Sequence, residues 1–233
     1  MHTILFRESN VDAGLFRVEP NRFSRAVRLR PSVISVTPCF DAERAEVVHF
    51  IERNYSDHYN AQITVEYPNL ISLRRVGGAV VAAAGFRFAG SDRLFLEQYT
   101  GAPIESLLDT PRRSIVEIGN LASSGGGASL FLFMALASYL NTVCATYAVI
   151  TCTASLERRL SRLGLEPRRI CAADPDRLDA RGNAWGSYYD RQPYVMSSDL
   201  DLAYKRVLSL FGKDFFRHRP SLLPRLHANS DCA

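Results

Sequence analysis

The sequence predicts a mixed α and β fold (α+β) built around one sheet. Its 233 residues are 47% hydrophobic and 22% charged, which is the composition of an ordinary globular protein. Strand-like runs alternate along the chain with helical patterns, and one stretch combines a strand, a glycine-rich turn and a helix. We therefore expect one domain over residues 31–216, preceded by an N-terminal arm over 1–30 and followed by a basic flexible tail over 217–233.

The individual elements follow from the spacing of apolar residues. Residues 32–36 alternate as a strand does, and the Gly77-Gly78 dipeptide suits a tight hairpin between two strands. The segment 128–140 is apolar nearly all round, which predicts a helix in the interior. Strands are predicted at 32–36, 69–75, 79–88, 94–99, 114–122, 147–153, 166–171 and 187–196. Helices are predicted after Asp41, after Pro103, over 128–140, over a basic segment ending at Gly164, and over 200–216.

The charge balance limits the classes of partner. The net charge is +4, and 26 of the 28 basic residues are arginine because Lys205 and Lys213 are the only lysines. This excess is too small to indicate a nucleic-acid-binding protein. Arginine does provide fixed charge for recognising carboxylate or phosphate.

The cysteine pattern and the hydropathy indicate a cytoplasmic, reduced protein. Five cysteines without CxxC spacing or a nearby histidine pair argue against a disulfide framework and a zinc site, so no metal is expected. Arg7 and Glu8 interrupt any secretion signal. The most apolar stretch, 130–140, has about half the length of ~20 residues that a membrane span needs, so no stable membrane insertion is expected.

The glycine-rich turn is the strongest indication of a binding site. Backbone N–H groups at the start of a helix lack partners within the helix and carry the positive end of its dipole. Three consecutive glycines, Gly125 to Gly127, would allow phosphate or pyrophosphate to lie against these amides. A flexible linker between strand and helix is the alternative interpretation.

This order of elements resembles the GNAT acyltransferase superfamily, in which a splayed strand leads into a loop that binds pantetheine and pyrophosphate. The family loop reads Gln/Arg-x-x-Gly-x-Gly/Ala, and Ser123-x-x-Gly126-x-Ala128 matches it except at the first position. The resemblance implies a mostly antiparallel sheet with a V-shaped splay, flanked by helices. It also implies that the donor lies on residues Leu121, Ala122, Ser123, Ser124, Gly125, Gly126, Gly127 and Ala128.

A closer resemblance is to the thermostable hemolysin family, over roughly residues 56–196. It rests on separate short blocks in one order: 95–99 (FLEQY) with 103–105 (PIE), 115–122 (IVEIGNLA), 162–167 (RLGLEP) and 185–190 (WGSYYD). The same region is distantly similar to acyl-homoserine-lactone synthases. Gly85-Phe86-Arg87 and Glu117 fall near positions of that pattern, while Asn120 replaces its arginine.

Acyl transfer to an amine needs a base and needs N–H donors for the thioester oxygen. Glu117 lies in the middle of an apolar strand, where burial can raise its pKa toward that of a general base. The amides after Asn120 can polarise the thioester. A salt bridge from Glu117 to Arg87 or Arg113 inside the sheet is the structural alternative.

Further residues are candidates for holding the acceptor. Glu97 could anchor the acceptor amine or form a structural ion pair, and Arg87 could clamp an acceptor carboxylate or pair with an internal glutamate. Asn120 could hold the splayed strand or the acceptor. Tyr99 and His58 are expected to bind substrate, His58 at the mouth of the site. The aromatic residues Trp185, Tyr188 and Tyr189 are expected in the core or in a pocket wall, where they could line an acyl tunnel.

Arginines crowd the segment downstream of the predicted donor loop. Arg158, Arg159 and Arg162 are candidates for docking an acidic acyl carrier protein, and a solvated helix face is the alternative. The predicted function is transfer of an acyl group from a phosphopantetheine thioester, on acyl carrier protein or coenzyme A, to an amino-acid-like or small amine acceptor. The donor would be a substrate, so no permanently bound cofactor is expected. A membrane-active lytic protein and a non-catalytic GNAT-like module are the alternatives.

Overall fold

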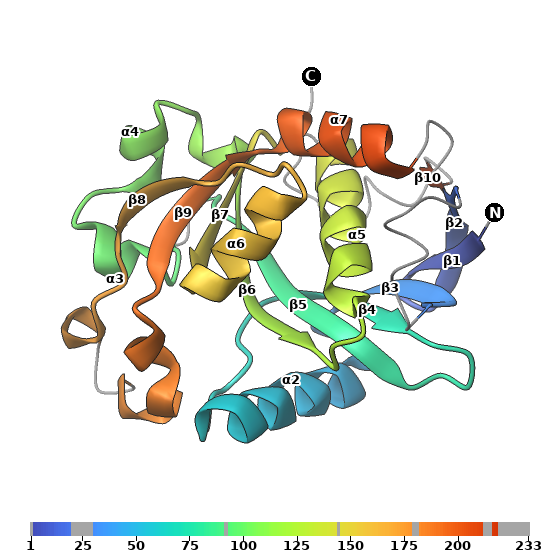
Figure 1. The fold of residues 1–233 in the computed structure, drawn as a ribbon, viewed down its shortest axis with the longest axis horizontal. Helices are drawn as coiled ribbons and strands as arrows, with labels where there is room; N and C mark the ends of the chain where they lie inside the picture. The colour runs from blue at the N-terminus through green and yellow to red at the C-terminus, as the bar shows by residue number, and fades with distance from the viewer. Residues whose placement is uncertain are drawn as a thin grey trace.

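One sheet of ten strands organises the molecule, in the order β10-β2-β1-β3-β4-β5-β6-β7-β9-β8 (Figure 1). The computed structural model describes residues 2–19, 30–90, 93–143, 145–178, 182–211 and 216–218. The strands are β1 (His2–Glu8), β2 (Val11–Val18), β3 (Val33–Pro38), β4 (Asn69–Arg74), β5 (Val80–Phe88), β6 (Ile115–Ser123), β7 (Tyr147–Cys152), β8 (Arg168–Ala172), β9 (Tyr194–Asp199) and β10 (Phe216–His218). The helices are α2 (Arg44–Tyr59), α3 (Glu97–Thr100), α4 (Ile104–Leu108), α5 (Ala128–Thr142), α6 (Ala154–Arg162) and α7 (Leu200–Phe211), with 3₁₀ turns at Arg112–Ser114, Pro175–Arg177 and Gly182–Arg191.

The sheet is mostly antiparallel and opens at one place. β6 pairs with β7 in parallel, but the pairing ends at Ile118 and Ile150, although β6 continues to Ser123. β6 stays paired with β5 over this last part, as far as the contact between Ser123 and Ala82. The two parallel neighbours therefore separate, which is the V-shaped splay that the resemblance to the GNAT superfamily implied.

Helices cover both faces of the sheet beside this splay (Figure 1). Ala82, Ala84 and Phe86 of β5 belong to the large core that also contains the buried face of α5. Ala83, which points to the opposite face, belongs to a second core under α2. Because α5 is buried nearly all round, as predicted, its N-terminus is held rigidly at the end of β6.

Several predicted elements are confirmed. The segments 69–75 and 79–88 form β4 and β5, and Gly77 and Gly78 in their turn have φ of 92° and 86°, a region that favours glycine. The strand, glycine turn and helix over 115–140 are also present. In the predicted basic helix, α6, Leu160 is buried and the arginines are exposed.

Two predicted strands are wrong in part or in full. Residues 94–99 form a turn and the start of α3, because the N–H groups of Phe95 and Leu96 bond a glutamate side chain instead of a neighbouring strand. Of 187–196, only the part from Tyr194 is a strand, and the preceding residues form a 3₁₀ turn. The last helix, predicted over 200–216, is described over Leu200–Phe211; residues 212–215 lie outside the described residues, and Phe216 belongs to β10.

The predicted N-terminal arm contains two strands of the sheet. β1 pairs with β2 and β3, and Ile4, Phe6 and Phe16 are buried in the large core. In the predicted tail, β10 pairs with β2. Residues 20–29 of the arm and 219–233 of the tail lie outside the described residues.

A buried carboxyl in β1 leads to a prediction about stability. Glu8 is 2% exposed, and burial raises its pKa to about 7, a rise that the Tyr139 side chain partly offsets. A carboxyl whose pKa is higher in the folded chain stabilises it below the unfolded pKa and loses that contribution as the pH rises through the folded pKa. We expect the free energy of unfolding to fall by about 1–3 kcal/mol between about pH 5 and pH 8 through this group.

Urea denaturation of the native protein and of Glu8→Gln at both pH values measures this effect. The variant should show a flatter pH dependence, because glutamine does not titrate. Equal pH slopes in the two proteins would contradict the prediction.

Candidate functional site

Two cavities meet where β6 and β7 separate. One has a volume of about 360 Å³, and the other is an open groove of about 580 Å³. The residues that line both are Tyr55, Gly119, Asn120, Thr151 and Tyr188. The splay therefore joins two differently lined spaces at a single short stretch of β6.

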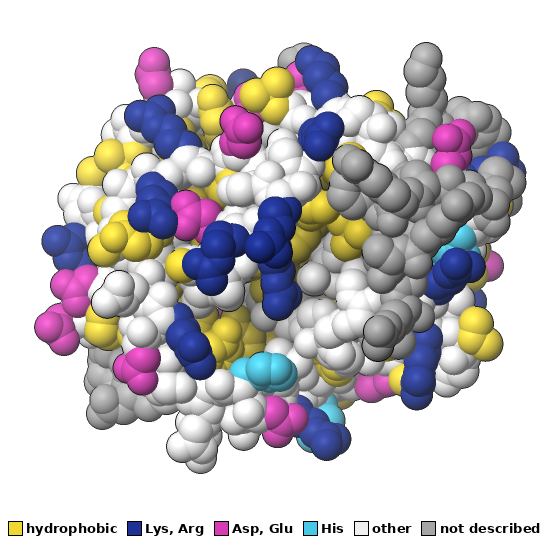
Figure 2. All heavy atoms as spheres, in the orientation of Figure 1, with side chains coloured by type: hydrophobic (Ala, Val, Ile, Leu, Met, Phe, Trp, Pro, Cys, Tyr) yellow, Lys and Arg dark blue, Asp and Glu magenta, His cyan; other side chains and the backbone are white. Residues whose placement is uncertain are grey.

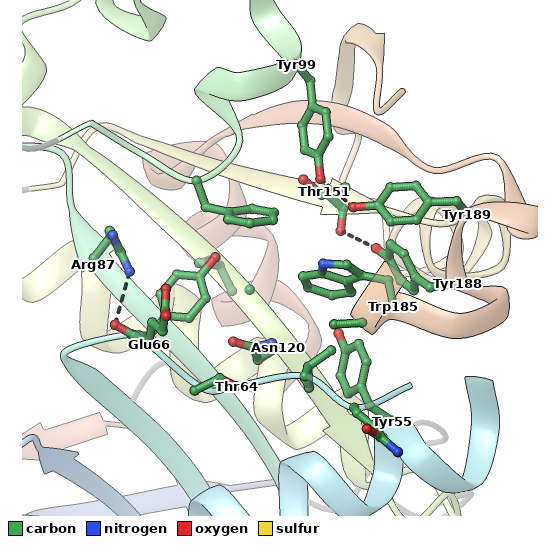
Figure 3. Close-up of a pocket in the computed structure, with 17 residues that line it drawn as sticks. Tyr55, Thr64, Glu66, Arg87, Tyr99, Asn120, Thr151, Trp185, Tyr188 and Tyr189 are labelled. Carbon is green, nitrogen blue, oxygen red and sulfur yellow. Dashed lines mark hydrogen bonds between the residues drawn. The ribbon is translucent and has the colours of Figure 1, made fainter. Parts of the chain in front are cut away.

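The smaller space, here called the aromatic cavity, is walled mainly by rings (Figure 3). The rings are those of Tyr55, Tyr67, Phe95, Tyr99, Trp185, Tyr188 and Tyr189. Trp185 lies at their centre, with ring centroids 5.4 Å from Tyr188 and 5.6 Å from Phe95. Such contacts between tilted rings stabilise a rigid apolar wall.

Tyr67 lies across two glycines of neighbouring strands. Gly85 of β5 and Gly119 of β6 are partners in the sheet. A Cβ atom at Gly85 would lie 2.5 Å from the Tyr67 ring, and one at Gly119 would overlap the Tyr67 hydroxyl. This part of the cavity therefore has its shape only because both positions lack side chains.

Arg87 is one of two charged side chains in the described lining of the aromatic cavity, and the other is Glu66. The Nη2 of Arg87 donates to the carbonyl oxygen of Glu66 at 3.1 Å, and the guanidinium carbon of Arg87 lies 5.0 Å from the centre of the Tyr67 ring. Its Nε lies 3.7 Å from Oε2 of Glu117. Arg87 thus faces the cavity, as a carboxylate clamp must, and also has the internal glutamate partner that the sequence offered as the alternative.

Glu117 is 1% exposed and is covered by the turn that follows residue 93. Its Oε1 accepts from the N–H of Leu96 at 2.8 Å, and its Oε2 accepts from the N–H of Phe95 at 3.1 Å. Burial raises the pKa of Glu117, and these two amides with Arg87 partly offset the rise. In the described structure the cavity wall at this point is formed by the residues that follow Glu117, and the carboxylate itself lines neither cavity.

Glu97 has the structural role that the sequence left as the alternative. Its two oxygens accept from Arg112 at 2.6 and 2.8 Å, and they also accept the N–H groups of Leu94 and Ile104. Burial alone would raise the pKa of Glu97, but Arg112 and the two amides lower it to about 2. With both oxygens occupied, this carboxylate is in no position to anchor an acceptor amine.

The remaining substrate candidates are divided between the two spaces. Asn120 is 7% exposed, has φ of 50° and lines both. Tyr99 lines the aromatic cavity, with its hydroxyl 2.5 Å from that of Tyr189. His58 is exposed at the end of α2, lines the groove instead, and has its Nδ1 2.8 Å from the carbonyl oxygen of Asn54.

The groove follows the predicted donor loop. Of that loop, Leu121, Ala122, Ser123, Ser124 and Gly125 line the groove, whereas Gly126, Gly127 and Ala128 are not part of its described lining. All three glycines have positive φ, between 59° and 86°. The three glycines turn the chain from β6 into α5, and Gly125 lines the groove together with the end of β6.

Basic side chains gather on this face, over α6 and beside the hollow that separates it from α2 (Figure 2). Arg158 and Arg159 line the groove together with Arg191. Arg162 is exposed on the same helix but is not part of the described lining. The three predicted docking arginines thus separate into two in the groove and one beside it.

Sequence reasoning missed the segment 61–67, which supplies four residues of the aromatic cavity besides Tyr67. Its burial alternates strictly, with Ala61, Ile63, Val65 and Tyr67 buried and the residues between them exposed. This alternation of apolar and polar residues was the available signal. Thr151, at the end of β7, carried no comparable signal because only its position in the fold brings it to the splay.

Comparisons with known proteins agree with this architecture. The model of the thermostable hemolysin family matches residues 38–204, most of the chain. The chain belongs to the thermostable hemolysin family. A comparison with curated proteins found no match. Among the described residues of this family member, no helix is long and apolar enough to cross a membrane.

Solved structures resemble this hemolysin-family chain in fold. TofI in an apo form has a TM-score of 0.56 at 16% identity, covering 76% of this chain and 96% of its own. The AHL synthase LasI has a TM-score of 0.54 at 13% identity, covering 79% and 98%. FeeM, an N-acyl amino acid synthase from uncultured soil microbes, has a TM-score of 0.52 at 13% identity, covering 76% and 98%. The predicted GNAT-like fold is confirmed.

The two glycines under Tyr67 lead to a prediction. We expect Gly85→Ala to reduce the free energy of unfolding by about 1–3 kcal/mol, because the added methyl displaces the Tyr67 ring. Chemical denaturation measures the loss. In a Tyr67→Ala background the same substitution should cost far less, and an equal cost in both backgrounds would contradict the explanation.

Proposed function

We propose that this protein is an acyltransferase that moves an acyl group from a phosphopantetheine thioester to the amine of a small, amino-acid-like acceptor. The observation that carries the proposal is the meeting of two unlike spaces at Gly119 and Asn120. One space is open and bordered by arginine, and the other is aromatic with one arginine at its wall. Two substrates of different chemistry could therefore meet at one point.

The groove suits the donor. Beyond Ile118, the edge of β6 that faces β7 has no strand partner in the described structure. A pantetheine arm carries amide groups, so it can hydrogen-bond to this open edge as a strand would. Arg158, Arg159 and Arg191 place positive charge along the groove, where the phosphate of the donor would lie.

The aromatic cavity suits the acceptor. In our proposal the guanidinium of Arg87 binds the acceptor carboxylate, and the amine lies at Asn120, next to the thioester. The ammonium first loses one proton to a base, and the neutral amine nitrogen then attacks the thioester carbonyl carbon to form a C–N bond. The C–S bond breaks, and the second proton lost by the nitrogen passes to the sulfur, which leaves as the thiol.

The general-base role of Glu117 stays a prediction, and the geometry adds a condition to it. Burial raises its pKa, as a base requires, but the turn at Phe95 and Leu96 covers the carboxylate. A proton must therefore reach Glu117 through a water molecule or after movement of this turn. The contacts of Glu117 are the N–H groups of Phe95 and Leu96 and, at 3.7 Å, the Nε of Arg87, which support a positioning role as the alternative.

The test is Glu117→Gln. We expect turnover to fall by about 100-fold or more, because glutamine neither accepts a proton nor accepts both backbone N–H groups. Thioester consumption with a panel of amines measures turnover, and thermal unfolding measures the structural loss. Asp57→Asn on the exposed side of α2 is the matched control.

The pH dependence separates the two roles of Glu117. If it is the base, turnover in the native protein rises with pH through its pKa, and that rise is absent in the variant. If it only positions Arg87, the variant keeps the rise and its loss appears mainly in the KM for the acceptor. Unchanged turnover and stability would remove Glu117 from the mechanism.

The position of the arginines predicts how donors are distinguished. Arg162 lies on α6 outside the described groove lining. We therefore expect Arg162→Glu to raise the KM only for donors attached to an acidic carrier protein, by about 5–10-fold at low salt. Arg158→Glu should raise the KM for both carrier-protein and coenzyme A donors. Arg75→Glu, exposed in the β4–β5 turn, is the control. Equal loss of both donors in Arg162→Glu would contradict docking at that position.

A further inference from the structure

We infer that the acceptor is an α-amino acid with an aromatic side chain, bound with its ring against Trp185. This inference rests on the proposed acyl transfer and specifies its substrate class. It follows from three features of the aromatic cavity: a rigid uncharged box at one end, a guanidinium at the other, and a polar side chain between them.

The box is built around Trp185. Its ring centroid lies 5.4 Å from that of Tyr188, 5.6 Å from Phe95, 6.0 Å from Tyr55 and 6.1 Å from Tyr189. Burial raises the pKa of each of these tyrosines, so their hydroxyls stay neutral at physiological pH. A flat uncharged group is the ligand part that such walls accommodate best.

The box is held rigidly by its backbone. A Cβ atom at Gly186 would overlap the carbonyl oxygen of Tyr59, so the turn that carries Trp185 lies directly on the end of α2. The N–H of Gln62 donates to the carbonyl oxygen of Ala184 at 2.7 Å, which ties the same turn to the segment 61–67. A preformed wall of this kind binds a ring without first having to be ordered.

The charged end is opposite the box. Figure 3 shows Arg87 and Trp185 on opposite sides of the cavity, with Asn120 between them. The Nε of Arg87 is buried and forms an ion pair with Glu117 at 3.7 Å, a distance too long for a hydrogen bond. Its Nη2 donates to the carbonyl oxygen of Glu66, and no described residue accepts from its Nη1, which leaves N–H donors for a ligand. A carboxylate is the group that would satisfy the guanidinium.

The polar side chain between the two ends faces the cavity and is free to bind a ligand. Asn120 is 7% exposed, lines the cavity, and its side chain has no hydrogen bond to another described residue. Its amide oxygen can accept from an ammonium group and leave the amine at the junction with the groove. The order carboxylate, amine, ring matches an aromatic α-amino acid.

The size of the cavity agrees with this class. A volume of about 360 Å³ lies in the usual range for sites that enclose a small organic molecule. An acceptor without a side chain would leave the box empty. A cationic side chain would find no carboxylate there, because the charged residues of the described lining, Glu66 and Arg87, lie away from Trp185.

The experiment uses Trp185 as its own reporter, because it is the only tryptophan of the chain. The full-length protein is titrated with phenylalanine, alanine, phenethylamine and lysine, each with and without coenzyme A, while tryptophan fluorescence is recorded. We expect a saturable change with phenylalanine. Alanine lacks the ring, phenethylamine lacks the carboxylate and lysine places a charge in the box, so each should bind at least about tenfold more weakly.

Two variants assign the contacts. Arg87→Lys keeps the charge but loses the planar guanidinium that can donate two parallel hydrogen bonds to a carboxylate. It should lower the affinity for phenylalanine by about tenfold and leave the affinity for phenethylamine unchanged. Arg53→Lys, exposed on α2, is the control and should change neither. Trp185→Ala, followed by calorimetry, should remove the preference for phenylalanine over alanine, and its circular dichroism spectrum checks folding.

Failure of the inference is separable from failure of the proposed function. The inference is wrong if alanine or lysine binds as tightly as phenylalanine or more tightly, or if phenylalanine does not bind with or without coenzyme A. In that case, acyl transfer to other amines would still support the proposed acyltransferase function. If phenylalanine binds but no thioester is consumed with any donor, the acyl-transfer proposal fails. If long-chain acyl donors alone change the Trp185 fluorescence, the box is an acyl-chain site and the inference is wrong.

Discussion

The separation of β6 from β7 beyond Ile118 is the constraint on which the site depends. A paired strand has both edges satisfied and its neighbours packed about 5 Å apart, which leaves no passage through a sheet. Once the pairing ends, β6 keeps its contact with β5 on one side and opens an edge on the other. The aromatic cavity and the arginine-bordered groove meet only because of this opening. Both proposed substrates would be held relative to the same few residues of β6.

Two kinds of contact maintain the opening: close packing against glycines, and hydrogen bonds to buried carboxylates. Gly85 and Gly119 leave room for Tyr67, and Asn120 adopts a positive φ that redirects the strand. The turn that covers the cavity has no sheet partner, so its N–H groups depend on Glu117 and Glu97. A buried carboxylate that accepts several amides and an arginine is a strong anchor, because removing it leaves several donors unsatisfied. Glu97 and Glu117, which the sequence marked for chemistry, therefore both hold the turn that contributes Phe95 to the wall of the site.

The two spaces differ in the way that two substrates of different chemistry require. In the proposed function, positive charge along the groove would attract an anionic donor at long range, and this attraction would weaken with salt. The aromatic cavity is largely apolar with Arg87 at one end, so it would select an acceptor by shape and by one carboxylate. Membership of the thermostable hemolysin family and the GNAT-like fold are consistent with this division. The difference between the two spaces comes from the residues that line them, because a shared fold does not specify a substrate.

The sequence by itself determined the mixed fold, the β4–β5 hairpin and the buried helix after the glycine turn, because each follows from periodicity or turn chemistry within a few neighbouring residues. The resemblance to the GNAT superfamily added the loop 121–128, and five of its eight residues line the groove. Only the tertiary structure decided that residues 94–99 form no strand and that Glu97 forms an ion pair with Arg112. The hydrogen bonds responsible join groups 15 or more residues apart in the sequence. The same holds for the aromatic cavity, whose walls come from α2, the segment 61–67, β6 and the 3₁₀ turn near Trp185. Local patterns report how a segment folds, whereas a site is formed by segments that meet only after folding.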